Sequence, residues 1–176
     1  LGNSAYHQAM RVSIDAVLDF ARRYAQAARA QGMTALADTL ERVPANGAAT
    51  FREALQSLRI LHYAFWCEGD YHNTLGRFDQ YMFPYLAADL AAGRETEESA
   101  FEWLEAFFLS CNRDSDLYPG LQQGDNGQSM VLGGATPDGE NGFNLLSRLC
   151  LRACGELRLI DPKINLRVNK ATPLEI

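Results

Sequence analysis

The feature that most constrains this chain is a helical period of apolar residues that recurs through most of its length. From Ser4 to Gln31, apolar side chains return every three or four positions, which places them on one face of a long helix. Asn3 or Ser4 can cap its start, and Gly32 can close its end. The positions expected on the buried stripe are Met10, Ile14, Val17, Leu18, Ala21, Tyr24, Ala25 and Ala28.

The same period, together with start and stop signals, predicts further helices. A short helix is expected over residues 34–43, before Pro44. Thr50 and Glu53 have the spacing of a capping box, and the helix that they begin should run to about Cys67. The remaining helices are expected from Tyr81 to Gly93, from Thr96 onward, and from Phe143 to Leu157.

Individual residues of the fourth and fifth helices predict where Pro84 lies, which acidic residues occupy a first turn and which side chains face inward. Pro84 should lie in the first turn of its helix, where a missing backbone N–H costs little. Thr96 is followed by Glu97 and Glu98, which are favourable near the positive end of the helix dipole. The side chains expected to face inward from this fifth helix are Phe101, Leu104, Phe107 and Phe108.

Only two segments have the pattern of strands. Ser129 to Leu132 is a short apolar run, and residues 164–168 alternate between apolar and polar side chains. A polar loop over residues 112–127 precedes the first strand, and a turn-rich connection follows it. Because two isolated strands do not make a stable sheet, we expect the sheet to continue outside this chain.

The amino-acid composition narrows the classes of partner and the cellular compartment that are expected for this chain. The chain carries 22 acidic and 16 basic side chains, for a net charge of −6, which disfavours nucleic acid and anionic membrane surfaces as partners. No apolar run has the length of a membrane span, and residue 1 onward lacks the pattern of a signal peptide. With four cysteines spread through helical segments, a reducing cytoplasm fits best.

Several constellations of reactive residues favour a structural interpretation. His62 and Cys67 lie about 140° apart around one helix, so no metal site is predicted there or with His72. Cys150 and Cys154 share a helix face among apolar neighbours, which indicates packing. The glycines and acidic residues of 133–139 lack the lysine of a phosphate-binding loop. All four cysteines are expected to be buried and unpaired.

Two polar segments are the candidate site. Residues 70–74 place ionisable and hydrogen-bonding side chains directly before a glycine, and residues 126–129 do the same before an apolar strand. Polar groups at the ends of strands are common in binding sites. From the residues alone, a role in satisfying the local backbone is equally compatible.

The order of several motifs resembles the glycyl radical enzymes of the pyruvate formate-lyase-like family. The segment of residues 76–84, Gly-Arg-Phe-Asp-Gln-Tyr-Met-Phe-Pro, is the most specific. Weaker matches in the same order are Arg22-Arg23-Tyr24-Ala25, Val43-Pro44, Thr50 to Gln56, Gly133-Gly134, Asp138-Gly139 and Asn144-x-Leu146-Ser147.

This resemblance implies an α/β fold in which the chain is a fragment of a ten-stranded barrel, mostly α-helical, with about six helices and two short strands. Residues 1–176 would be a single partial domain that ends before the family's catalytic cysteine and radical glycine. A Leu at residue 1 and an end at Ile176 agree with a piece of a longer enzyme. The chain alone is expected to be inactive and to carry no cofactor and no catalytic residue.

The resemblance also implies the chemistry of the parent enzyme. A radical S-adenosylmethionine activase would install a glycyl radical, and a lyase or dehydratase-like reaction would cleave a C–C, C–O or C–N bond of a small polar metabolite. A homodimeric parent is one option, with the oligomeric state left open. The alternative is a helical binding domain of the same ancestry without radical chemistry. By position, the substrate-binding residues would be His72, Asn73, Asn126, Gln128, Ser129 and Met130.

Overall fold

The computed structural model describes residues 2–69, 72–114 and 127–172. The chain divides into two compact units, Leu1–Cys67 and Glu68–Ile176. Each unit is described by itself. Within the described residues there are six helices and two short strands, as the sequence predicts for a mostly helical α/β chain. None of these helices is both long and apolar enough to cross a membrane.

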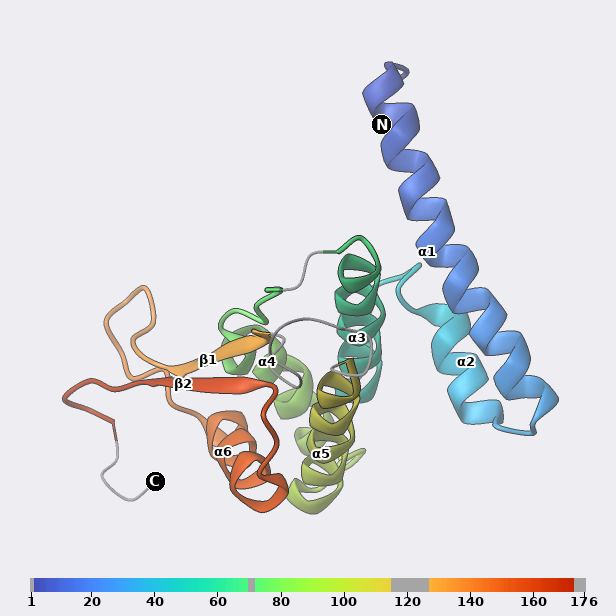
Figure 1. Ribbon diagram of the computed structural model, residues 1–176. Helices are drawn as coiled ribbons and strands as arrows, with labels where there is room; N and C mark the ends of the chain where they lie inside the picture. Colours follow the sequence, from blue (N-terminus) through green and yellow to red (C-terminus); the bar gives the residue numbers. More distant parts are fainter. Residues whose placement is uncertain (1, 70–71, 115–126, 173–176) are drawn as a thin grey trace. The chain divides into compact units, whose positions relative to one another are not determined.

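The first unit consists of three helices, which are α1 (Ala5–Ala30), α2 (Thr34–Arg42) and α3 (Phe51–Cys67). The Ser4 hydroxyl caps α1 by accepting the backbone N–H of His7. α2 runs beside the second half of α1 (Figure 1). A shared core joins the three helices and consists of Ala21, Ala25, Leu40 and Ile60, with Val17, Phe20 and Leu36 packed against it.

The predicted stripe of α1 is buried only in the second half of the helix. Ala21, Ala25 and Ala28 are buried, but Ile14 and Tyr24 are 46% and 57% exposed, so the prediction of burial is wrong for these two. For Ile14, in the first half of α1, the reason is the short length of α2, whose nine residues cover about 14 Å of a helix face, whereas α1 has 26 residues.

The second unit combines three helices with a parallel pair of strands. Its elements are α4 (Phe78–Ala91), α5 (Glu97–Arg113), β1 (Ser129–Gly133), α6 (Leu145–Leu157) and β2 (Lys163–Arg167). β1 and β2 lie side by side in parallel, with Ser129 opposite Lys163 and Gly133 opposite Arg167 (Figure 1). Gly76 forms a parallel bridge with Met130 on β1. The strand positions therefore agree with the prediction to within one residue.

Pro84 lies in the interior of α4, so the prediction that it occupies the first turn is wrong. The helix begins at Phe78, three residues earlier than Tyr81, and contains Pro84 without a break. A proline there forfeits one backbone hydrogen bond to the carbonyl four residues earlier. The early start has a tertiary cause, because side chains of residues 77–80 bind the segment that joins β1 to α6.

The fifth helix begins at the predicted place, and both the fifth and the sixth helix have a side-chain cap. Thr96 and Ser99 form a reciprocal capping box on α5, and Asn144 and Ser147 form one on α6. Phe78 of α4 stacks on Phe107 of α5 with ring centroids 5.5 Å apart. All four predicted inward-facing residues of α5 are buried, namely Phe101, Leu104, Phe107 and Phe108.

The cysteines follow the prediction only in part. All four are free, and Cys111 and Cys150 are buried. Cys67 is exposed and Cys154 is half-buried, so the prediction of burial is wrong for Cys67 and incomplete for Cys154. Cys67 is the last residue of α3, where the apolar stripe ends.

Candidate functional site

The described parts of the two polar segments singled out from the sequence, residues 72–74 and 127–129, meet at the start of β1. The backbone N–H of Leu75 donates to the carbonyl of Ser129 at 2.7 Å, and the N–H of Val131 donates to the carbonyl of Gly76 at 2.8 Å. Residues 72–74 therefore lie near residues 127–128, although more than fifty positions separate them in the sequence.

His72 and Gly127 are in direct contact at this meeting point. A Cβ built on Gly127 would overlap Nδ1 of His72, and it would lie 3.1 Å from Cε1. Gly127 has a φ of +65°, a left-handed conformation that side chains with a Cβ adopt only under strain. Two features therefore require glycine at position 127: the left-handed backbone conformation and the imidazole of His72 where a Cβ would lie. The His72 ring itself is exposed.

The predicted site residues at the start of β1, including Gln128 directly before it, alternate between two sides of the strand. Gln128 and Met130 are completely buried, whereas Ser129 between them is half-buried, as expected from the alternation of side chains along a strand. The Gln128 amide donates from Nε2 to the carbonyl of Cys111 at 2.9 Å. Its Oε1 is buried and accepts no hydrogen bond within the described residues. Gln128 and Ser129 therefore present their polar atoms to different surroundings.

Two predicted residues remain to be placed. Asn73 is half-buried and follows His72 toward the start of α4. Asn126 lies outside the described residues. The structure therefore brings His72 next to the Gly127–Gln128 segment, as predicted, and leaves the role of all six residues in substrate binding a prediction.

Three further side chains, to which the sequence analysis assigned no role, tie the start of α4 to the end of β1 and to the loop before α6. The Arg77 guanidinium donates to the carbonyl of Gly133 at 2.7 Å. Asp79, which is fully buried, accepts the N–H of Gly133 at 2.6 Å. The Gln80 amide donates to the carbonyl of Gly142 at 2.6 Å. The signal in the sequence was the motif itself, which places charged and amide side chains around the apolar Phe78.

Asp79 also reaches α6. The hydroxyl of Ser147 donates to Asp79 Oδ2 at 2.5 Å, and the amide of Asn144 donates to the backbone carbonyl of Asp79 at 3.1 Å. One carboxylate oxygen thus joins the end of β1 to the first turn of α6. This network fixes the position of the strand that carries Gln128 and Met130.

Tyr81 and Cys150, two titratable groups of the second unit, are not suited to proton transfer near neutral pH. Burial, with smaller contributions from Cys111 and Cys150, raises the pKa of Tyr81, whose hydroxyl donates to the carbonyl of Leu75 at 2.7 Å. Burial, with smaller contributions from Asp79 and Cys154, raises the pKa of the Cys150 thiol well above its usual range. Both groups therefore stay protonated at neutral pH and act through hydrogen bonds and packing.

Metal ligands do not gather at this place or elsewhere in the described residues. Within residues 2–69, 72–114 and 127–172, no three His, Cys, Asp or Glu side chains are close enough to hold a metal ion. The described residues place an exposed imidazole, His72, and a buried amide, Gln128, near the start of β1.

Parallel strands joined through helices place the second unit among the α/β proteins. The profile of the family described as pyruvate formate lyase-like matches residues 2–176. The chain belongs to this family.

Individual relatives agree with that assignment. The chain is 30% identical over 178 residues to isethionate sulfite-lyase from Bilophila wadsworthia, which covers 90% of this chain and 21% of the relative. A crystal structure of a glycyl radical enzyme from Archaeoglobus fulgidus superposes with a TM-score of 0.79 at 26% identity, over 91% of this chain and 23% of that one.

A structure concerned with 1,2-propanediol dehydration in Roseburia inulinivorans superposes with a TM-score of 0.83 at 28% identity. It covers 96% of this chain and 24% of the other. The prediction that the chain has the fold of part of a glycyl radical enzyme is thereby confirmed. The chain spans about a fifth of the length of the curated relatives that it matches.

Proposed function

We propose that this chain is part of a glycyl radical enzyme of the lyase or dehydratase type, which cleaves a C–C, C–O or C–N bond of a small polar metabolite. The observation that carries the proposal is the match of nearly the whole chain to a family whose relatives include a sulfite-lyase and a protein of diol dehydration. The radical glycine and the cysteine that reacts with substrate would come from polypeptide outside these 176 residues.

Within such an enzyme, this chain would supply binding and orientation. The His72 ring and the Gln128 amide are polar groups held beside the start of β1, and both could fix a substrate that carries hydroxyl or similar groups. The unused Oε1 of Gln128 supports this assignment, because a buried acceptor is favourable only when a donor reaches it. Asn73, Asn126, Ser129 and Met130 would complete the lining.

The 176 residues would form a partial domain of a cytoplasmic enzyme that is activated by a radical S-adenosylmethionine partner. The glycyl radical, once installed, supplies the hydrogen-abstraction chemistry. The residues of this chain would exclude water from the substrate and hold it in one orientation. Radical chemistry requires such exclusion because solvent and oxygen quench radicals.

Anaerobic activation tests the proposal. A longer polypeptide that contains this chain should give an organic radical signal in electron paramagnetic resonance after treatment with an activase, followed by turnover of a hydroxylated substrate. The 176-residue chain alone should give neither. A radical signal from the short chain would contradict the assignment, and a reading frame that stops after Ile176 would favour a helical binding domain without radical chemistry.

A further inference from the structure

Two charged side chains bind both backbone groups of one residue. Arg77 donates to the Gly133 carbonyl at 2.7 Å, and Asp79 accepts the Gly133 N–H at 2.6 Å. We call these two side chains the Gly133 clamp. Gly133 is the last residue of β1 and has a φ of +68°. A Cβ there would lie 2.8 Å from the carbonyl oxygen of Arg167, so only glycine fits under the clamp.

The clamp lies immediately beside a very short backbone ladder. Gly76, which directly precedes Arg77, accepts the N–H of Val131, and Leu75 donates to Ser129. A ladder of so few bonds specifies its register weakly. Because side chains alternate along a strand, a slip of one residue would turn Gln128 and Met130 away from their buried face and bring Ser129 into it.

We propose that Arg77 and Asp79 are positioning residues that set the register of β1 against the Leu75–Gly76 segment. Both clamp bonds are charge-assisted, which makes them stronger than the ladder bonds beside them. Asp79 is fully buried, so water does not compete for its carboxylate. The clamp thereby decides which side chains of β1 face the candidate site, and it holds Gly127 beneath His72.

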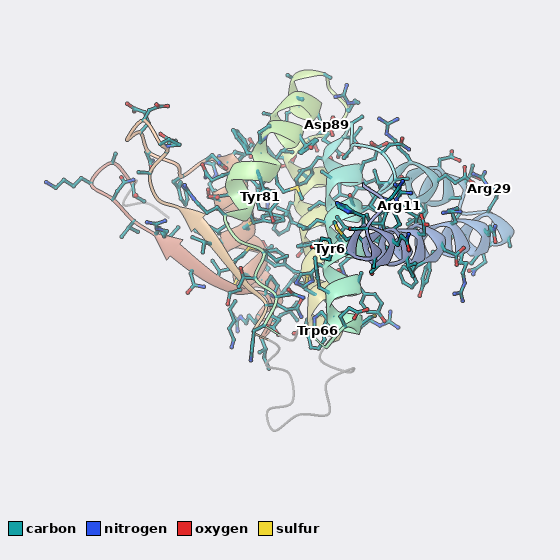
Figure 2. All side chains as sticks on the ribbon, turned by 90° about the horizontal axis from the view of Figure 1, so that it is seen from above. Tyr6, Arg11, Arg29, Trp66, Tyr81 and Asp89 are labelled. Atoms are coloured by element: carbon teal, nitrogen blue, oxygen red, sulfur yellow. The ribbon has the colours of Figure 1, made fainter. Side chains whose placement is uncertain are left out.

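Ser147 provides a way to separate this role from general stabilisation. Its hydroxyl binds the same Oδ2 of Asp79 but belongs to α6, not to β1. A second control is Asp89, which lies in the last turn of α4 (Figure 2). Asp89 is buried and pairs with Arg94 at 2.7 Å. Asp79→Asn alters the clamp. Ser147→Ala alters the link to α6 and the α6 capping box but leaves the clamp residues in place. Asp89→Asn alters a buried carboxylate near the other end of α4.

Amide hydrogen exchange in the 176-residue chain tests the register directly. In Asp79→Asn, the amides of Leu75 and Val131 should exchange about tenfold faster or more, while amides inside α5 keep their protection. Ser147→Ala and Asp89→Asn should leave Leu75 and Val131 unchanged. Unchanged exchange at Val131 in Asp79→Asn, or equal acceleration in all three variants, would overturn the proposal. If Asp79→Asn does not fold, Arg77→Met provides the same comparison.

A second experiment rests on the proposed function, because it needs Gln128 to touch the substrate. In the full-length enzyme, Asp79→Asn should lower kcat/KM about tenfold, and Gln128→Ala added to it should lower kcat/KM far less than in the unaltered enzyme. If the double variant loses kcat/KM by the product of the two single losses, the proposal that Asp79 acts through Gln128 is overturned. An unaltered enzyme without any activity would count against the proposed function, and the exchange experiment would still decide the role of the clamp.

Discussion

Replacing Gly127 with alanine probes the contact between His72 and the start of β1. The new methyl group would overlap Nδ1 of His72, and the backbone φ of +65° would strain any residue with a Cβ. The strain costs about 1–2 kcal/mol, offset by about 0.4–1 kcal/mol because alanine restricts the unfolded chain. The clash itself adds little to the free energy of unfolding, because the exposed imidazole can rotate away.

Gly139→Ala is the matched control. Gly139 has a φ of +86° and nothing within 4 Å of its potential Cβ, so it shares the backbone strain without the clash. Both variants should therefore lose about 0.5–1.5 kcal/mol of unfolding free energy in urea titrations. Only Gly127→Ala should shift the NMR signals of the His72 ring, which can be assigned among three histidines by substitution.

The two glycine variants should also differ in kcat/KM. In the full-length enzyme, Gly127→Ala should lower kcat/KM about tenfold or more, because small displacements of a binding group are costly in a closed site. Gly139→Ala should retain kcat/KM. Unchanged His72 signals in Gly127→Ala would refute the contact, and unchanged kinetics with shifted signals would refute the role of His72 in binding.

Three other outcomes are expected. Asn144→Ala removes the acceptor of the Ser147 N–H and the donor to the Asp79 carbonyl. Urea titrations should therefore show a loss of about 1–2 kcal/mol in the free energy of unfolding. A loss below a few tenths of a kcal/mol would argue against this cap. Thiol reagents should label Cys67 rapidly and Cys111 and Cys150 only after unfolding, and fast reaction of Cys150 would contradict its burial. Burial raises the pKa of the Cys150 thiol in the folded state above its value in the unfolded chain. The protonated thiol therefore makes its full contribution to the free energy of unfolding below the usual thiol pKa, and this contribution is lost as pH rises above about 8.5. Cys150→Ala should flatten that part of the stability–pH curve, and an unchanged slope would show that other groups cause it.

The helices were predictable because their signals are local. Ser4 and Thr96, together with apolar spacing, locate the starts of two helices to within a residue, and apolar spacing alone locates the start of α6 to within two. The start of α4 was not predictable in this way. It depends on bonds from Arg77 and Asp79 to Gly133, more than fifty residues away, and these outweigh the cost of a proline in the helix interior.

Part of the candidate site was also predictable from local sequence signals, and part was not. That residues 72–73 and 127–129 are polar and flank apolar elements is legible in the sequence. That the side chains of Gln128 and Ser129 point to opposite faces follows from strand alternation once the strand is assigned. The contact of His72 with Gly127 required the pairing of Leu75 with Ser129, which no local pattern encodes.

The strand β2 has a consequence for handling this polypeptide. In the described part of the chain β2 pairs with β1 and with no other strand, so β2 lies at an edge of this sheet. Such an edge promotes self-association, and the positive side chains of Lys163 and Arg167 oppose it through mutual repulsion between copies. Added salt screens that repulsion. Preparations of the isolated chain should therefore remain monodisperse in dilute, low-salt buffer and form oligomers as ionic strength and concentration rise.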